Sequence, residues 1–259
     1  MNAETLRVLI AFDGSSSAMA VARCWSSWES GRVSLEASLL TITPGHAASA
    51  GNAAACPPLA DKLTTAKAWF SQAGLALESV VVEGEKPAKE IIEEAQHRKV
   101  DLIAMGTRGL SPLRGLLLGS VAAEVASRSP IPIWLMGPNA AIPAALGRVL
   151  RLLVAIDGSK QAAHAANWVG RMAPYLGETS IELFSVQPAF SPFEGMLDAA
   201  AGDFHHWGQA LGEAAIKATR QQMGIAGHRA TASVATGDTV PMILAQADGG
   251  RADVVVVAP

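Results

Sequence analysis

The sequence lacks several features that would define other classes of protein. It has 259 residues but only two cysteines, Cys24 and Cys56, in no metal-ligand or redox spacing. A reducing cytoplasm is therefore the expected compartment. No run of about 18 apolar residues occurs, which argues against a membrane span, and the polar start Met1–Arg7 argues against a signal peptide. The net charge of -3 predicts no basic face for nucleic acid.

What the chain does have is a long, apolar composition and an internal repeat. Half of the residues are hydrophobic, and at about 100 to 200 residues per domain the length allows two buried cores. The segment Arg7–Ser15 recurs as Arg151–Ser159, and Asp101–Met105 recurs as Asp253–Val257. One supersecondary pattern is therefore written twice.

Strands and helices alternate in each copy. In the first copy an apolar strand ends at Asp-Gly-Ser, and the order then predicts helix 16–30, strand 34–42, loop 43–58, helix 59–72, strand 77–82, helix 87–98, strand 100–105, helix 120–129 and strand 131–136. The second copy predicts strand 150–156, helix 161–173, strand 180–186, a polar and aromatic insertion 187–204, helix 205–222, strand 229–235, helix 239–247 and strand 252–257.

This alternation predicts parallel βαβ units with right-handed crossovers. The expected fold class is α/β, with two tandem doubly wound parallel-sheet domains, the second of which is truncated after its fourth strand. We expect a first domain over 1–137, a linker over 138–149 and an incomplete second domain over 150–259.

The stretch from Val100 to Trp134 carries the chemistry. A buried strand is followed by Gly106-Thr107-Arg108-Gly109, a nine-residue spacer, Gly119-Ser120 and an amphipathic helix. The amino end of a helix offers unpaired N–H groups and a positive dipole, which suit phosphate. No lysine precedes Ser120, so this is not a Walker loop, and the spacing is not that of the dinucleotide fingerprint. A loop that only turns the chain is the plain alternative.

The pattern Gly-x2-Gly-x9-Gly-Ser resembles the signature of the universal stress protein family, in its ATP-binding branch. The resemblance implies an adenine nucleotide alpha hydrolase-like fold with strand order 3-2-1-4-5 and ATP across the carboxyl ends of strands one and four. It also implies a stress-response regulator whose nucleotide is ATP, ADP or AMP, with Mg²⁺ as an optional ion.

The resemblance also assigns roles to residues around that switch point. The expected contacts to adenine and ribose are Ala11, Phe12, Asp13, Gly14 and Ser15, and the apolar residues expected to flank the base are Ile42 and Met105. The loop toward the phosphates would be Gly106, Thr107, Arg108 and Gly109, and the phosphates would be held by Gly119, Ser120 and Val121.

Some of these residues have a second interpretation, as do the second copy and the function. Asp13 and Ser15 are also good N-caps for the helix that follows them. Asp157 and Ser159 repeat them, but the second copy has no Gly-Ser pair to hold phosphate, so we interpret them as residues that serve the fold.

No nucleophile with a supported base is evident, which argues against an enzyme. A slow ATP hydrolase or adenylate-transferring enzyme acting at Ser120, and a nucleotide-free dimerising module, are the alternatives.

The last strand of the first copy predicts an interface. Residues 131–136 form an apolar edge strand, and such edges must be covered. In the family that the chain resembles, this strand pairs with that of a neighbouring domain. The second copy offers no such strand, so the expected assembly is a homodimer formed through residues 131–136. The other expected partner is an adenine nucleotide, and neither nucleic acid nor a membrane is expected as a partner.

Overall fold

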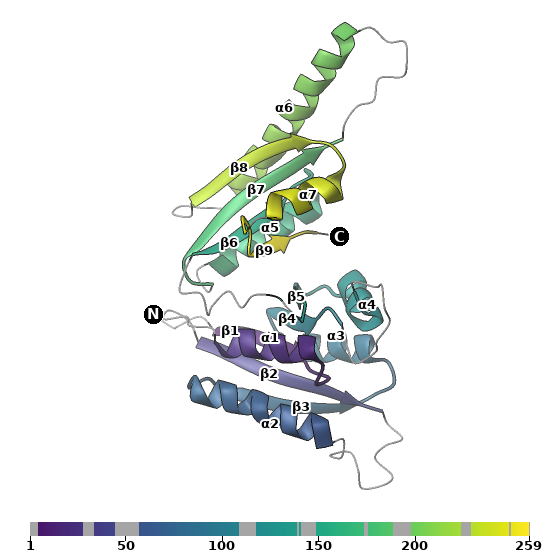
Figure 1. The fold of residues 1–259 in the computed structure, drawn as a ribbon, viewed down its shortest axis with the longest axis vertical. Coiled ribbons are helices and arrows are strands. Elements are labelled where there is room, and N and C mark those ends of the chain that lie inside the picture. The colour runs from purple at the N-terminus through teal and green to yellow at the C-terminus, as the bar shows by residue number, and fades with distance from the viewer. Residues whose placement is uncertain are drawn as a thin grey trace. The chain divides into compact units, whose positions relative to one another are not determined.

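The computed structural model describes residues 5–27, 34–44, 57–108, 118–138, 140, 149–173, 176–188, 198–223, 229–248 and 250–258. The chain divides into two compact units, Met1–Leu146 and Gly147–Pro259 (Figure 1). Each unit is described by itself below.

Unit 1 contains a five-stranded parallel sheet. Its strands are β1 (Thr5–Ala11), β2 (Ser34–Thr43), β3 (Leu77–Glu83), β4 (Leu102–Gly106) and β5 (Ile133–Met136). Their order in the sheet is β3-β2-β1-β4-β5, so the predicted order 3-2-1-4-5 is confirmed. The order reverses between β1 and β4, where Ala11 lies opposite Met105. This reversal is the switch point at which open α/β sheets bind ligands.

Four helices connect these strands. They are α1 (Ser16–Ser26), α2 (Pro57–Gln72), α3 (Pro87–His97) and α4 (Ser120–Arg128). Helix α1 packs against α2, and α3 packs against α4. Right-handed crossovers in this strand order place the first pair on one face of the sheet and the second pair on the other.

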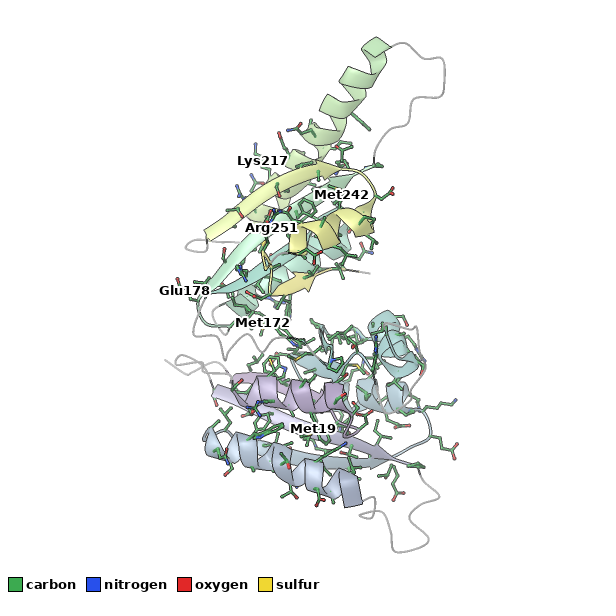
Figure 2. All side chains as sticks on the ribbon, viewed as in Figure 1. Met19, Met172, Glu178, Lys217, Met242 and Arg251 are labelled. Carbon is green, nitrogen blue, oxygen red and sulfur yellow. The ribbon has the colours of Figure 1, made fainter. Side chains whose placement is uncertain are left out.

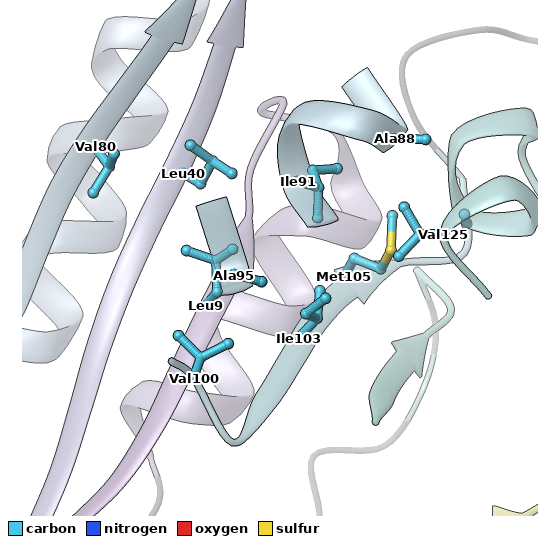
Figure 3. Packing of buried hydrophobic residues seen from close by; sticks show 11 residues of the cluster. Leu9, Leu40, Val80, Ala88, Ile91, Ala95, Val100, Ile103, Met105 and Val125 are labelled. Carbon is cyan, nitrogen blue, oxygen red and sulfur yellow. The ribbon is translucent and has the colours of Figure 1, made fainter. Parts of the chain in front are cut away.

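The core of unit 1 fills both faces of the sheet. Under α3 and α4, buried side chains include Leu9, Ile91, Met105 and Val125 (Figure 3). On the other face, Trp25 of α1 is fully buried and meets Trp134 edge to face, with ring centroids 5.7 Å apart. Trp25 is therefore a core anchor.

Unit 2 repeats this plan with four strands. Its elements are β6 (Leu150–Ala155), α5 (Lys160–Met172), β7 (Thr179–Gln187), α6 (Asp198–Met223), β8 (Arg229–Thr236), α7 (Thr239–Ala247) and β9 (Val254–Val256). The strands are parallel and lie in the order β8-β7-β6-β9, which matches the first four of unit 1. Helix α5 buries Met172, labelled in Figure 2, together with Ala166 and Val169.

Several predicted boundaries are wrong, including the end of α1, which is Ser26 rather than residue 30, and the start of β4, which is Leu102 rather than Val100. Helix α6 begins at Asp198, inside the expected insertion, because the alanine-rich run before Phe204 favours a helix in spite of one glycine. Strand β5 begins at Ile133, because Pro132 has no N–H and Ser129 Oγ already accepts a hydrogen bond from the Ile131 amide. Strand β9 is only three residues long, shorter than the apolar run 252–257.

Candidate nucleotide site

The predicted site residues come from three neighbouring strand ends of unit 1. Ala11 is the last residue of β1 and residues 12–15 follow it, Ile42 is the last residue but one of β2, and Met105 and Gly106 end β4, with residues 107 and 108 in the loop that follows. Because parallel strands end at one edge, these segments meet there. The amino end of α4 adds Gly119, Ser120 and Val121. Gly109, also predicted for the site, lies outside the described residues.

The loop after β1 is held by its own polar groups. Asp13 Oδ1 accepts a hydrogen bond from the amide of Ser15 at 2.9 Å, while Gly14 takes a φ of +75°, which favours glycine. Ser15 Oγ accepts a hydrogen bond from the Ala18 amide at 3.2 Å and so caps α1. Ser15 is therefore the N-cap, and Asp13 shapes the turn that precedes it.

Hydrogen bonds also draw together the two ends of the loop between β4 and α4. The amide of Gly119 donates to the carbonyl of Thr107 at 2.7 Å, and the amide of Thr107 donates to the carbonyl of Met136 at 2.9 Å. Ser15 Oγ donates to the carbonyl of Arg108 at 3.2 Å. The loop after β1 and the loop after β4 are thus tied to each other.

Helix α4 begins without a side-chain cap. Its N-cap is Gly119, with φ -71° and ψ 157°, which has no side chain to accept a hydrogen bond from the first-turn amides. Helices α3 and α7 also begin without a side-chain cap, whereas α1 and α5 are capped by Ser15 and Ser159. The first-turn amides of α4 have no intrahelical partner, and the side chain of Ser120 is exposed beside them. This arrangement is suited to an anion.

Gly106 is required by packing rather than by its backbone angles. A Cβ at this position would lie 2.5 Å from Ser17 Cβ and 3.1 Å from the Ala18 amide nitrogen. Real Cβ atoms essentially never come as close to another heavy atom as the first of these distances. The first glycine of the motif therefore lets β4 lie against the first turn of α1.

The two residues predicted to flank an adenine base belong to one apolar cluster. Ile42 is partly exposed, whereas Met105 is 5% exposed and packs with Ile91 and Val125 (Figure 3). The structure therefore leaves Ile42 accessible and commits most of Met105 to the core. Leu118 and Val121 are partly buried against the same cluster.

Helix α2 brings residues that sequence reasoning missed. Lys62 Nζ donates a hydrogen bond to the carbonyl of Gly14 at 2.5 Å. Leu59 is so close that a Cβ on Gly14 would lie 2.9 Å from its Cδ1. No local pattern signals this contact, because 48 residues separate Lys62 from Gly14.

Unit 2 repeats only the first half of this arrangement. Asp157 Oδ1 accepts a hydrogen bond from the Ser159 amide at 2.8 Å, and Ser159 caps α5. Hydrogen bonds from the side chain and backbone of Ser159 lower the pKa of Asp157. The described residues of unit 2 contain no counterpart of the amino end of α4.

These features define a doubly wound α/β protein. The loop at its switch point leads to a helix start that is suited to an anion. A model of the universal stress protein family matches residues 5–136 and 149–258, which is most of the chain. The chain therefore belongs to the universal stress protein family. Among the described residues, no helix is long and apolar enough to cross a membrane.

Individual relatives agree with this assignment. Universal stress protein YxiE of Bacillus subtilis is 36% identical over 29% of this chain and 49% of its own length. Universal stress protein Slr1230 of Synechocystis is 29% identical over 49% of this chain and 41% of its own length. This chain thus spans less than half of either relative. A solved universal stress protein from Archaeoglobus fulgidus is 21% identical, with a TM-score of 0.61 over 96% of this chain and 85% of that one. It shows a common fold.

Proposed function

We propose that unit 1 binds ATP, or the related ADP or AMP, across the carboxyl ends of β1 and β4. The observation that carries this proposal is the uncapped first turn of α4 behind Gly119, beside the exposed Ser120. A dipole and free amides at this position favour phosphate. The same loop is tied to the end of β1 through Ser15 and Arg108, where a nucleoside would continue from the phosphates.

Each part of the nucleotide has a suitable group nearby. The amides of α4 and the hydroxyl of Ser120 would hold the phosphates, and the exposed carboxylate of Asp13 would accept from ribose hydroxyls. The partly exposed side chains of Ile42 and Leu118 provide an apolar edge for the base. Lys62 adds a positive charge beside Gly14. Mg²⁺, where present, would be held chiefly by phosphate oxygens and water.

We infer a regulatory output, exerted in the cytoplasm, rather than a catalytic one. Bound phosphates would bridge α4 and the loop after β1. They would therefore favour the arrangement in which Ser15 joins the loops after β1 and β4 over one in which these loops are separated. A ligand shifts such an equilibrium only by its differential affinity for the two arrangements. The response would therefore be a change in loop order or in assembly.

We propose that the assembly is a homodimer formed through β5. This strand is at the edge of the sheet, and Leu135 on it is 38% exposed. A lysine at an exposed edge disfavours pairing between sheets. Sedimentation should therefore show a dimer for the wild type and a monomer for Leu135→Lys. Val81→Lys, on the opposite edge strand β3, should remain dimeric; a wild-type monomer would refute the interface.

Calorimetric titration with ATP tests nucleotide binding directly. Gly119→Val should abolish most of the heat, because its side chain would occupy the space through which a phosphate reaches the α4 amides. The native φ of -71° suits valine, so this variant tests the approach of the ligand rather than backbone strain. No heat from the wild type, or equal heats from both proteins, would refute the proposal.

Asp13→Asn and Asp157→Asn are a matched pair of variants that test which unit binds ATP. Both aspartates accept a hydrogen bond from the serine amide two residues later. Within the part of the chain that the structure describes, only Asp13 belongs to a unit that contains a counterpart of α4. Asp13→Asn should weaken ATP binding, whereas Asp157→Asn should leave it unchanged. The reverse result would move the site to unit 2.

A further inference from the structure

The peptide group between Gly14 and Ser15 is held from both sides. Its carbonyl oxygen accepts a hydrogen bond from Lys62 Nζ at 2.5 Å, and its amide donates to Asp13 Oδ1 at 2.9 Å. The peptide bond is trans, so the carbonyl and the N–H point in nearly opposite directions. Lys62 of α2 and Asp13 of the loop after β1 therefore bind opposite ends of one peptide group.

The charges of the two partners match the dipole of this peptide group. An ammonium binds the negative carbonyl end and a carboxylate binds the positive amide end, so both hydrogen bonds are charge-assisted. Each bond polarises the peptide in the same sense and so strengthens the other. Removing the ammonium of Lys62 should therefore also weaken the bond between the Ser15 amide and Asp13.

The packing of α2 brings Lys62 to this carbonyl. Ala66 and Phe70, about one and two turns further along the helix, are fully buried, so Lys62 lies on the stripe of α2 that packs against the rest of unit 1. Leu59, from the same end of α2, places its Cδ1 2.9 Å from where a Cβ on Gly14 would be. Within the described part of the chain, Lys62 forms no ion pair with a carboxylate. Its charge is therefore directed at the carbonyl of Gly14.

Unit 2 contains the same turn without this contact. Gly158 has a φ of +83°, close to the +75° of Gly14, and Asp157 Oδ1 accepts from the Ser159 amide at 2.8 Å. The side chain that α6 brings there is Ala215, whose Cβ is 3.5 Å from where a Cβ on Gly158 would lie. Alanine has no donor, and no side chain among the described residues donates to the Gly158 carbonyl. The lysine contact thus accompanies the turn of the unit that contains α4.

The held peptide fixes groups that the nucleotide site would use. One oxygen of the exposed Asp13 is committed to the Ser15 amide, which leaves the other for a ligand hydroxyl. Ser15 follows directly, and its hydroxyl donates to the carbonyl of Arg108 at 3.2 Å in the loop toward α4. A continuous set of contacts therefore runs from Lys62 through the Gly14 turn to the loop after β4.

Given the nucleotide site proposed for unit 1, on which this inference rests, we propose that Lys62 is a positioning residue of that site. It orients the peptide between Gly14 and Ser15 and, through this peptide, the carboxylate of Asp13. Lys62 thus acts on the nucleoside end of the ligand rather than on the phosphates. Because coupling between two contacts is reciprocal, a bound nucleotide should in turn stabilise the contact between α2 and the turn after β1.

Calorimetry with ATP and with AMP on the full chain tests this role. Lys62→Met keeps the apolar stem of the side chain but not the ammonium, and should weaken the binding of both nucleotides about fivefold, to the same extent. Lys62→Arg restores a charged donor and should recover most of the affinity. Lys67→Met, at an exposed lysine of the same helix, is the matched control and should bind as the wild type does. A loss for ATP that clearly exceeds the loss for AMP would place the ammonium on the outer phosphates and overturn the proposal.

The effect of Lys62 should also depend on Asp13. In an Asp13→Asn background, Lys62→Met should lower ATP affinity by less than about twofold, because both side chains act on the same peptide group and their effects do not add. Fully additive losses would show that Lys62 acts independently of Asp13 and would contradict the positioning role.

A measurement without nucleotide separates the role of Lys62 from the existence of the site. Hydrogen exchange at the Ser15 amide, followed by NMR, should be about fivefold faster in Lys62→Met than in the wild type, whereas exchange at the Ser159 amide should not change. Unchanged exchange at Ser15 would overturn the proposal whatever the chain binds. Absence of ATP binding by the wild type would refute the nucleotide site and this role together, whereas equal binding by the wild type and Lys62→Met would refute the role of Lys62 alone.

Discussion

The hydroxyl of Ser15 caps α1 and at the same time donates to the carbonyl of Arg108, 3.2 Å away in the loop after β4. One side chain thus connects the start of a helix with the loop that leads to the candidate phosphate seat. Ser159 caps α5 in the same way, with a distance of 3.0 Å from its Oγ to the Ala162 amide. In unit 2 no hydrogen bond to a described residue of an equivalent loop accompanies that cap.

Replacing each serine by alanine separates these two tasks. Both Ser15→Ala and Ser159→Ala should lower the free energy of unfolding by about 1 kcal/mol through loss of a helix cap. Only Ser15→Ala should also weaken ATP binding, because it frees the Arg108 loop. Chemical denaturation and calorimetry measure the two effects. Equal ATP affinities in the two variants would show that the contact between the loops does not shape the site.

Gly106→Ala should destabilise unit 1. Its Cβ would meet Ser17 Cβ at 2.5 Å and the backbone of α1 at 3.0 Å, and such overpacking costs about 1–3 kcal/mol. Gly137→Ala is the control, since the nearest atom to its Cβ would be Thr107 Oγ1 at 3.9 Å. Thermal unfolding should show a lower midpoint for the first variant only. An unchanged midpoint for Gly106→Ala would mean that α1 can shift at no cost.

The sequence predicts the elements that carry the candidate site where the signal is local. The landmarks Asp13, Gly106 and Ser120 are each fixed by a strand end or a helix start, and the alternating apolar pattern places those elements in order. The strand order followed from the family resemblance. Lys62 could not be predicted, because its contact with Gly14 joins α2 to the loop before α1, and only the folded sheet brings these two segments together.

The exposure of β9 and of α7, which buries none of its residues, shows a second limit of sequence reasoning. The apolar run that includes Val254–Val256 predicts a buried strand, and Thr239–Ala247 predicts a helix; both elements form. Their exposure depends on the neighbours that pack on them, and apolar periodicity does not specify a neighbour. For the same reason, Met105 was predicted to flank a base, whereas α3 and α4 pack over most of it.

Arg98, the C-cap of α3, joins that helix to β3 at the amino end of the sheet, away from the candidate site. Its guanidinium bonds to Glu78 of β3 at 2.6 and 3.1 Å and to Glu94 of α3 at 2.5 Å, beside a hollow that Arg7 and Glu36 also line. Arg98→Met should reduce stability by about 1 kcal/mol, a value that allows for solvent around Glu78. ATP affinity should not change. Arg128→Met, which removes one exposed pair within α4, should cost only about 0.5 kcal/mol.

The difference in stability between the wild type and Arg98→Met should depend on pH in a definite direction. The hydrogen bond from Arg98 lowers the pKa of Glu78 below its ordinary value of 4.5 in the folded protein. The stabilising contribution is therefore present above pH 4.5 and is lost as the pH falls through the lowered pKa. Denaturation from pH 7 to pH 3 should show the gap between wild type and Arg98→Met narrowing at the acidic end. A gap that widens there would contradict the role assigned to Glu78.

Cys24 should be an inert thiol while unit 1 is folded. It is fully buried in α1, and burial raises the pKa of the thiol from 9.0 to about 12. Because the thiolate is the reactive form, alkylation at pH 8 should be much slower in the native protein than in urea. A Cys56→Ser background makes the reading specific to Cys24. The raised pKa also favours the folded state below pH 9, and this contribution is lost as the pH rises toward 12. Rapid native alkylation would instead show that α1 opens locally, at the helix on which the Ser15 contact and the Gly106 packing both depend.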